Sequence, residues 1–234
     1  MPRRPRLVVP GIPHHIVQRT RKGAELFPDR RDPHRYLDLL AACAGKHGLG
    51  IRAYCLLSDH VHLVAVPERE ESLAAAMRPV AVRYAHYVNR SCGGSAGGRL
   101  WADRPQSCPL DQMHFWAAVR YVERHPLKSG LVIRAERYGW SSGRTHCGRV
   151  PNPLLTGDLE HLGVVEDWAA WLRDPPDPAL VATLHACTRT GRPAGSPAFI
   201  ARLEKRCGRP LATPTRGRPP WHGQRPCRGR RHEP

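Results

Sequence analysis

Two histidines stand one residue apart in the stretch LLSDHVHLVAV, which runs from Leu56 to Val66. The surrounding residues are mostly apolar, as in a β-strand. Side chains two residues apart on a strand point to the same face, so His60 and His62 project together while Val61 points into the core. Two imidazoles on one face can bind the same metal ion. On spacing alone, an ordinary pair of histidines beside a hairpin turn is an equally good interpretation.

A second group of candidate residues lies in the segment DQMHFWAAVRYVERH, which is predicted to be a helix that begins at Asp111. At about 100° per residue, its core face is formed by Phe115, Trp116, Val119 and Val122. Tyr121 falls nearly opposite that face, and His125 follows it by one turn as its surface neighbour. Exposed tyrosines on solvated helix faces are common. The alternative is a phenol presented toward a site, with a third imidazole beside it.

Together these residues could carry out phosphoryl transfer. His60, His62 and His125 would hold a divalent cation, whose open coordination positions would take phosphate oxygens. Tyr121 would be the nucleophile and form a covalent phosphotyrosine, which keeps the bond energy for rejoining. Imidazole ligands suit Mn²⁺ and softer ions better than Mg²⁺, which prefers oxygen. The expected cofactor is therefore a divalent cation, Mg²⁺ or Mn²⁺.

The elements that must position these residues follow from turn and capping signals. Strands are predicted over 14–19, 51–57 and 60–66, and the two residues between the last two indicate a tight antiparallel hairpin. Helices are predicted from Asp32, as N-cap, to Gly48, over 71–90, and from Asp111 to a stop at Pro126. With one more strand to close the sheet, this order predicts an α+β fold: an antiparallel sheet with helices on one face.

The chain is predicted to contain one α+β domain over 1–150, a small helical extension over 151–208 and a basic tail over 209–234. Two short helices, 178–191 and 196–208, flank a turn in the extension. They could form a helix-turn-helix, although many helical hairpins that bind nothing look the same. The tail is expected to be disordered. Its RGRP sequence resembles a minor-groove hook, but a plain polybasic tail is the favoured interpretation.

The balance of charge points to a polyanionic partner. Among 234 residues, 37 Lys and Arg stand against 20 Asp and Glu, which gives a formal net charge of +17. Such an excess opposes compaction, and phosphate backbones are its usual partner. The competing explanations are an Arg-rich composition that reflects a GC-rich genome and a basic tail that only solubilises the protein. No segment is apolar and long enough for a signal peptide or a membrane span, so no membrane partner and a cytoplasmic location are expected.

The chain resembles the single-tyrosine HUH transposases of small bacterial insertion sequences, and especially the REP-associated tyrosine transposases. HUH stands for His–hydrophobic–His, here His60 to His62. The resemblance covers nearly all of residues 3 to 145, with the segments in the order of the family. The segments that carry it are GIPHHIVQR, AYCLLSDHVHLV, RYAHYVNR, GRLWADR, AAVRYVERHPLKSGLV and YGWSS.

This resemblance implies a ferredoxin-like fold and metal-dependent cleavage of single-stranded DNA, expected here to be a hairpin. The tyrosine of the family becomes linked to the 5′ phosphate and leaves a free 3′-OH, and Tyr121 stands at its position. His60 and His62 match the paired ligands. The third ligand position is usually Asn or Gln but is His125 here. SDHVH replaces the usual PNHVH, so Asp59 would either adjust the hairpin or add a carboxylate near the ion.

The resemblance and the charge also predict partners. A homodimer is one expected assembly. Three further tyrosines, Tyr84, Tyr87 and Tyr138, lie in matching segments, and Tyr84 or Tyr87 could be the nucleophile instead. Phosphate contacts are expected from arginines of the matching segments and of the tail, namely Arg19, Arg83, Arg104, Arg120, Arg216 and Arg218.

Two functions from different classes remain open at this point. The first is an enzyme that cleaves and rejoins DNA strands, as the intact Tyr121 and histidine pair favour. The second is a domesticated relative that grips folded single-stranded DNA without cutting, as the unusual His125 slightly favours. A phosphoesterase of the RNA-ligase type would need two H-x-[ST] motifs, and HVHL does not supply one.

Overall fold

The computed structural model describes residues 6–91, 99–157, 159 and 164–211. The tail that carries Arg216 and Arg218 lies outside these residues. The first part of the chain forms β1 (His14–Arg19), α1 (Asp32–His47), β2 (Leu49–Leu56), β3 (His60–Pro67), α2 (Ser72–Ser91), β4 (Gln106–Pro109) and α3 (Gln112–Lys128). The later part forms a 3₁₀ turn (Ala135–Arg137), α4 (Gly143–His146), α5 (Trp168–Arg173), α6 (Pro178–Thr190) and α7 (Pro197–Cys207).

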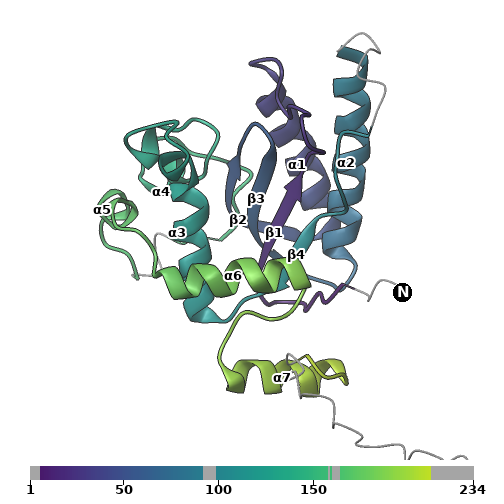
Figure 1. The fold of residues 1–234 in the computed structure, drawn as a ribbon, viewed down its shortest axis with the longest axis vertical. Coiled ribbons are helices and arrows are strands. Elements are labelled where there is room, and N and C mark those ends of the chain that lie inside the picture. Colours follow the sequence, from purple (N-terminus) through teal and green to yellow (C-terminus); the bar gives the residue numbers. More distant parts are fainter. Residues whose placement is uncertain (1–5, 92–98, 158, 160–163, 212–234) are drawn as a thin grey trace, which may run out of the picture.

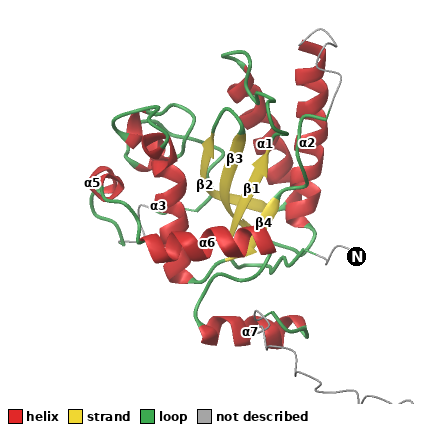
Figure 2. Cartoon of the chain, in the orientation of Figure 1, coloured by secondary structure: helices red, strands yellow, loops and turns green. Residues whose placement is uncertain are grey.

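The sheet at the centre of the molecule has the strand order β2-β3-β1-β4, and each neighbouring pair is antiparallel (Figures 1 and 2). The β2–β3 connection is the predicted tight hairpin. The central pair is β1 and β3, in which Val17 lies opposite His62 and Arg19 opposite His60. This is the ferredoxin-like arrangement, and the predicted α+β antiparallel fold is confirmed.

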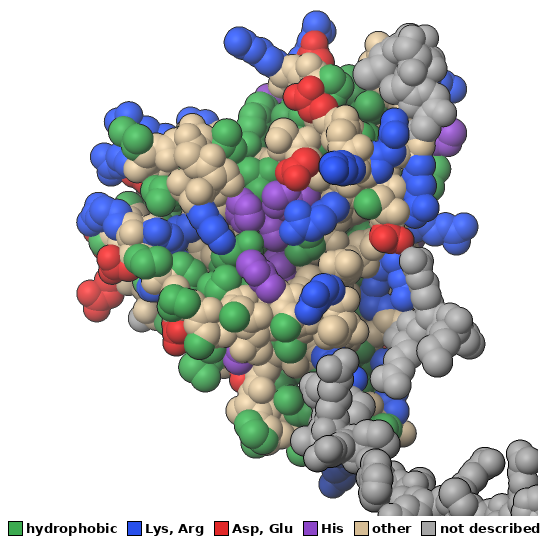
Figure 3. All heavy atoms as spheres, in the orientation of Figure 1, with side chains coloured by type: hydrophobic (Ala, Val, Ile, Leu, Met, Phe, Trp, Pro, Cys, Tyr) green, Lys and Arg blue, Asp and Glu red, His purple; other side chains and the backbone are tan. Residues whose placement is uncertain are grey.

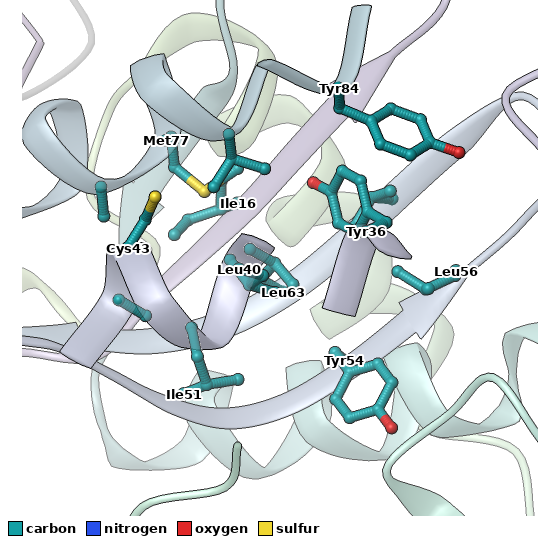
Figure 4. Packing of buried hydrophobic residues seen from close by; sticks show 14 of the residues in the cluster. Ile16, Tyr36, Leu40, Cys43, Ile51, Tyr54, Leu56, Leu63, Met77 and Tyr84 are labelled. Atoms are coloured by element: carbon teal, nitrogen blue, oxygen red, sulfur yellow. The ribbon is translucent and has the colours of Figure 1, made fainter. Parts of the chain in front are cut away.

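Helices cover both faces of the sheet, which corrects the prediction of helices on one face. Val61 and Leu63 of β3 point into a core with α1 and α2, where Tyr36 and Tyr84 pack edge to face (Figure 4). The opposite face of the same strand presents Val64 to α3 and α6. Both faces therefore carry apolar side chains, and each face must be covered to remove them from water.

The cover of the second face comes from parts of the chain far apart in sequence. Helix α3 packs across β2 and β3, and α6 lies in front of β4 and β1 (Figure 1). Leu184 of α6 is completely buried in this layer. Part of the predicted extension thus completes the core over the sheet, and the proposed domain boundaries stay predictions.

The capping signals placed most helix ends correctly. Asp111 is the N-cap of α3, and its carboxylate accepts a hydrogen bond from the backbone N–H of His114 at 2.9 Å. Two details differ. Asp32 is the first residue of α1 rather than its cap, and α3 runs past Pro126 to Lys128. A proline so close to the end of a helix costs only one terminal hydrogen bond, so the last turn continues.

Helices α6 and α7 pack against different parts of the molecule, although a helix-turn-helix was considered for them. Phe199 and Leu203 of α7 form a small core with Leu7 and Val9 near the start of the chain. Ser196 caps α7, as predicted, and Gly208 ends it in the left-handed region with φ 61°. In the part of the chain that the structure describes, no helix is long and apolar enough to cross a membrane.

Candidate metal centre and nucleophile

The β2–β3 hairpin presents His60 and His62 on the face of the sheet that α3 covers. Alternation along β3 places them there, and both side chains are buried, with 8% and 1% of their surfaces exposed. Figure 3 shows histidine side chains gathered near the middle of this face, with Lys and Arg side chains around them. The same-face pairing expected from the sequence is therefore observed.

Helix α3 brings His125 to the same place. One ring nitrogen from each of His60, His62 and His125 lies within 4.8 Å of the other two. Three buried nitrogens there, Nε2 of His60, Nε2 of His62 and Nδ1 of His125, have no hydrogen-bond partner in the described part of the chain. Buried imidazole nitrogens are normally paired. Each of the three histidines that come together thus carries an unpartnered ring nitrogen, which fits the set of donors that a divalent cation requires.

The other nitrogen of His60 bonds to the neighbouring residue. Nδ1 of His60 donates a hydrogen bond to Oδ1 of Asp59 at 2.5 Å. The proton on Nδ1 leaves the lone pair of Nε2 free to face the cluster, and a carboxylate in this position orients a metal-binding histidine. Asp59 is thus placed beside the His60 ring, and its carboxylate lies next to the candidate metal site.

His62 is held from behind by a buried chain of polar side chains. Its Nδ1 lies 3.0 Å from Nε2 of His15, and Nδ1 of His15 lies 2.8 Å from Oγ1 of Thr188. The Thr188 hydroxyl in turn donates to the carbonyl of Leu184 at 2.7 Å. This chain links β3, β1 and α6.

Electrostatics keep the histidine cluster neutral. Burial lowers the pKa of His60 and His62 below the usual value. Burial, with the neighbouring His60, lowers the pKa of His125 to about 4. At neutral pH all three rings therefore lack the second proton, and neutral imidazole is the form that binds metal.

Tyr121 lies in the middle of these rings and not on a solvated face. Its side chain is 6% exposed, because α6 packs on α3 and closes over it. The ring centroids of His62 and His125 lie 5.5 Å and 5.3 Å from that of Tyr121. Burial raises the pKa of the phenol, and the cationic Arg19 opposes that rise. Of the two interpretations considered for Tyr121, the exposed tyrosine on a solvated face is therefore wrong, and the proximity of Tyr121 to His125 is confirmed.

Two further side chains contact the phenol. The ring of His185, on α6, packs edge-on against Tyr121 with centroids 5.0 Å apart. The ammonium of Lys128 lies 5.7 Å from the centre of the Tyr121 ring. Together with Arg19, Lys128 adds positive charge to the rim of the site, where a phosphate would approach.

The arginines predicted to bind DNA are dispersed. Arg19 is exposed at the end of β1 opposite His60. Arg83 is exposed on α2, beyond the other face of the sheet, and the guanidinium of Arg120 stacks 4.3 Å from the ring of Trp171. Arg104 lines a cavity of about 580 Å³ beside β4. Only Arg19 of this set lies at the histidine cluster within the described residues.

Sequence reasoning missed His15, Thr188 and His185. The doublet His14–His15 at the start of a strand was a signal, but its partner depends on the pairing of β1 with β3, which a sequence alone does not give. Thr188 and His185 stand on one face of α6 in a helix that was assigned to an extension. Their contribution depends on that helix packing over the sheet.

The comparisons with known proteins come from a family model and from solved structures. A model described as "Transposase IS200 like" matches residues 8–125, and no curated protein matches the chain. A structure of a REP-associated tyrosine transposase bound to a REP hairpin aligns at 17% identity and a TM-score of 0.52, covering 68% of this chain and 93% of that one. A candidate transposase from Deinococcus radiodurans R1 aligns at 20% identity and a TM-score of 0.37, covering 52% and 95%.

The likeness to the REP-associated tyrosine transposase structure supports the fold. The family model reaches from the segment before β1 to His125, so it includes the histidine pair, the tyrosine and the third imidazole. It spans just over half of the residues, and the chain belongs to the IS200-like transposase family.

Proposed function

We propose that this transposase cleaves and rejoins single-stranded hairpin DNA through a covalent 5′-phosphotyrosine on Tyr121, with Mg²⁺ or Mn²⁺ as the cofactor. The observation that carries the proposal is the close approach of three imidazoles, each with an unpartnered ring nitrogen, beside a buried phenol. A core histidine cluster with no further role would be expected to satisfy these nitrogens internally.

The proposed reaction is an in-line displacement at phosphorus. The Tyr121 oxygen forms a bond to phosphorus, the bond from phosphorus to the 3′ oxygen breaks, and the departing oxygen takes a proton from water. The phenolic proton is released to solvent. The reverse attack by a 3′-OH on the phosphotyrosine restores a phosphodiester and the free tyrosine, so no external energy source is needed.

The side chains around the site have distinct parts in this reaction. His60, His62 and His125 would hold the ion, which when bound would polarise the phosphoryl group and neutralise developing charge. Arg19 and Lys128 would attract the phosphate and stabilise the phenolate as it forms. Because the pKa of Tyr121 is raised, the phenol is protonated at neutral pH and must lose its proton as it attacks.

A DNA hairpin is the proposed substrate. The similar REP-associated tyrosine transposase is bound to a REP hairpin. The net charge of +17 on the present chain suits a phosphate backbone. The basic cavity beside β4 offers a path for a strand, since Arg6, Arg104, Arg189, Arg192 and Arg209 line it. A homodimer and a cytoplasmic location stay predictions.

The decisive experiment is a search for a covalent protein–DNA adduct. Purified protein is incubated with a library of single-stranded hairpins and Mn²⁺ or Mg²⁺, and adducts are resolved by denaturing electrophoresis. The wild type should give an adduct that Tyr121→Phe abolishes, while binding of the same hairpins stays near that of the wild type. The Phe ring keeps the contacts with the histidines, so the fold should persist.

The alternative nucleophiles provide matched controls. The hydroxyl of Tyr84 donates to the carbonyl of Leu26 at 2.9 Å, and that of Tyr87 donates to Asp32 at 2.9 Å, both in the layer of α1 and α2. Tyr84→Phe and Tyr87→Phe should therefore keep the adduct. An adduct that survives Tyr121→Phe but disappears in one of the controls would show that the tyrosine replaced in that control is the nucleophile. Tight hairpin binding by the wild type without any adduct would support the binding module instead.

A further inference from the structure

Helix α6 lies outside the segment that the family model matches, residues 8–125, yet it reaches the candidate metal centre. The hydroxyl of Thr188 contacts His15, and His15 contacts His62. All three side chains are almost completely buried, with exposed fractions of 4%, 1% and 1%. Water therefore does not compete for these hydrogen bonds, and their geometry is set by the protein.

The carbonyl of Leu184 is the last acceptor in this series of hydrogen bonds, and it fixes the position of every proton in the series. The carbonyl of Leu184 can only accept, so the Thr188 hydroxyl must donate its single proton there. Its oxygen must then accept from Nδ1 of His15, which leaves Nε2 of His15 as an acceptor. That nitrogen can accept only from Nδ1 of His62. The lone pair of His62 is consequently on Nε2, the nitrogen that faces the cluster.

The opposite polarity conflicts with the structure at both ends. It would place an N–H on Nε2 of His62, a buried nitrogen that has no acceptor within hydrogen-bond distance among the described residues, and would leave that nitrogen no lone pair for an ion. It would also leave the 2.7 Å contact of Thr188 with the Leu184 carbonyl without a hydrogen. The thiol of Cys108 lies 3.2 Å from the same hydroxyl, and with the Thr188 proton directed at Leu184 it can donate to the Thr188 oxygen as well.

We propose that Thr188 is a positioning residue for the metal centre: through His15 it holds His62 in the tautomer whose Nε2 can bind the ion. The metal-binding part of this inference rests on the proposed function, whereas the direction of the hydrogen bonds from His62 to Thr188 does not. It assigns to α6 a role in metal binding that the matched segment alone does not contain.

The tautomers can be observed directly in the metal-free full-length protein. Two-bond ¹H–¹⁵N correlation spectra separate histidines that are protonated at Nδ1 from those protonated at Nε2. His15 and His62 should both be protonated at Nδ1. Protonation of either ring at Nε2 would overturn the proposal without the need for any variant.

A series of α6 variants then tests the consequence for metal binding. Thr188→Val keeps the shape of the side chain but removes the hydroxyl, and loss of such an outer hydrogen bond should weaken Mn²⁺ binding about 10-fold to 100-fold. Thr188→Ser restores the hydroxyl and should bind nearly as the wild type does. Affinities are measured by calorimetry, and the melting temperature of each variant is recorded beside them.

The same helix contains a matched control. Thr183 also donates to the carbonyl four residues earlier, that of Ala179 at 3.0 Å, but it is exposed. Thr183→Val therefore removes the same type of helix hydrogen bond but leaves the hydrogen bonds between Thr188, His15 and His62 intact, and its Mn²⁺ affinity should be unchanged. Equal affinities for Thr188→Val and Thr183→Val would overturn the proposal. If Thr188→Val fails to fold, the tautomers of the wild type still decide.

Failure of the proposed function would look different. If the wild type bound neither Mn²⁺ nor Mg²⁺, the metal-dependent mechanism would be ruled out. The two-bond spectra would still show whether the hydrogen bonds run from His62 through His15 to Thr188. A wild type that binds Mn²⁺ with His62 protonated at Nε2 in the metal-free state would keep the metal centre and remove the role of Thr188.

Discussion

The imidazole of His185 packs edge-on against the phenol of Tyr121, with ring centroids 5.0 Å apart and planes at 73°. His185 and Thr188 stand three residues apart on α6, so a single helix contacts both the candidate nucleophile and the side chains behind His62. Rotation of the Tyr121 ring toward solvent would have to displace His185. Helix α6 therefore restricts the directions from which the phenol can meet a phosphate.

Removal of the His185 ring should slow cleavage without weakening metal binding. In His185→Ala the phenol gains freedom, and misplacement of a nucleophile by about 1 Å can cost roughly a hundredfold in rate. We expect a fall of roughly tenfold to a hundredfold in single-turnover cleavage, with Mn²⁺ affinity unchanged. His185→Phe keeps a ring against Tyr121 and should retain most of the rate. Equal losses in both variants would show that the imidazole acts chemically rather than by contact.

The sequence was sufficient for the residues whose placement depends on local periodicity. Alternation along β3 placed His60 and His62 on one face, and the turn of a helix placed Tyr121 beside His125. It was not sufficient where long-range packing decides. The burial of Tyr121 depends on α6, which starts more than fifty residues later in the chain, and the contact of His15 with His62 depends on strand pairing. Neither is encoded in a local pattern.

Stability of the helix that carries Tyr121 and His125 should depend on Glu123. This carboxylate is fully buried and accepts hydrogen bonds from Ser142 at 2.5 Å, His146 at 2.6 Å and Trp168 at 2.7 Å. Glu123→Gln places an amide N–H₂ against these donors and removes the charge that pairs with His146. We expect the free energy of unfolding in urea to fall by roughly 3–5 kcal/mol.

An exposed glutamate offers the comparison for this change. Glu166 lies at the surface, so Glu166→Gln should leave stability within about 0.5 kcal/mol. If Glu123→Gln lost no more than this, the buried network would not be what holds α3 against α4 and α5.

Acidification should destabilise the metal-free protein well before the carboxylates titrate. Burial lowers the pKa of His14 and of His125 to about 4 and that of His15 to about 3, against 6.5 in an unfolded chain. Between these values the unfolded state binds protons that the folded state does not, so stability is present above pH 6.5 and is lost as the pH falls toward 4.

The expected slope for this effect is roughly 1.4 kcal/mol per pH unit for each such histidine. Urea unfolding at pH 7, 6 and 5 measures it. Replacement of His125 by Asn should remove one histidine from the slope, and a profile that is flat from pH 7 to 5 in the wild type would contradict the burial of these rings as neutral groups.

The cavity beside β4 should contribute to DNA binding through phosphate contacts. Two buried polar atoms there, Oγ of Ser107 and one terminal nitrogen of Arg192, have no partner among the described residues. Arg189→Ala combined with Arg192→Ala should lower hairpin affinity and reduce the slope of log K against log salt by about 2. Fluorescence anisotropy from 50 to 300 mM salt measures this. Arg144→Ala, exposed on α4, is the control and should change the slope by less.

The identity of the third ligand should be visible in the preference between metals. In the transposases that the chain resembles, the position of His125 usually carries Asn or Gln, whose amide oxygen is a harder donor than an imidazole nitrogen. Mg²⁺ prefers oxygen, whereas imidazole favours Mn²⁺. His125→Asn should therefore weaken Mn²⁺ binding about tenfold or more, and should raise the affinity for Mg²⁺ relative to Mn²⁺. The matched control is His86→Asn, an exposed histidine on α2, which should leave both dissociation constants unchanged. Calorimetric titration with each ion gives the two constants. If His125→Asn altered neither the Mn²⁺ constant nor the ratio of the two, His125 would be a neighbour of the site rather than a ligand, and His60 and His62 would hold the ion with solvent or substrate oxygens.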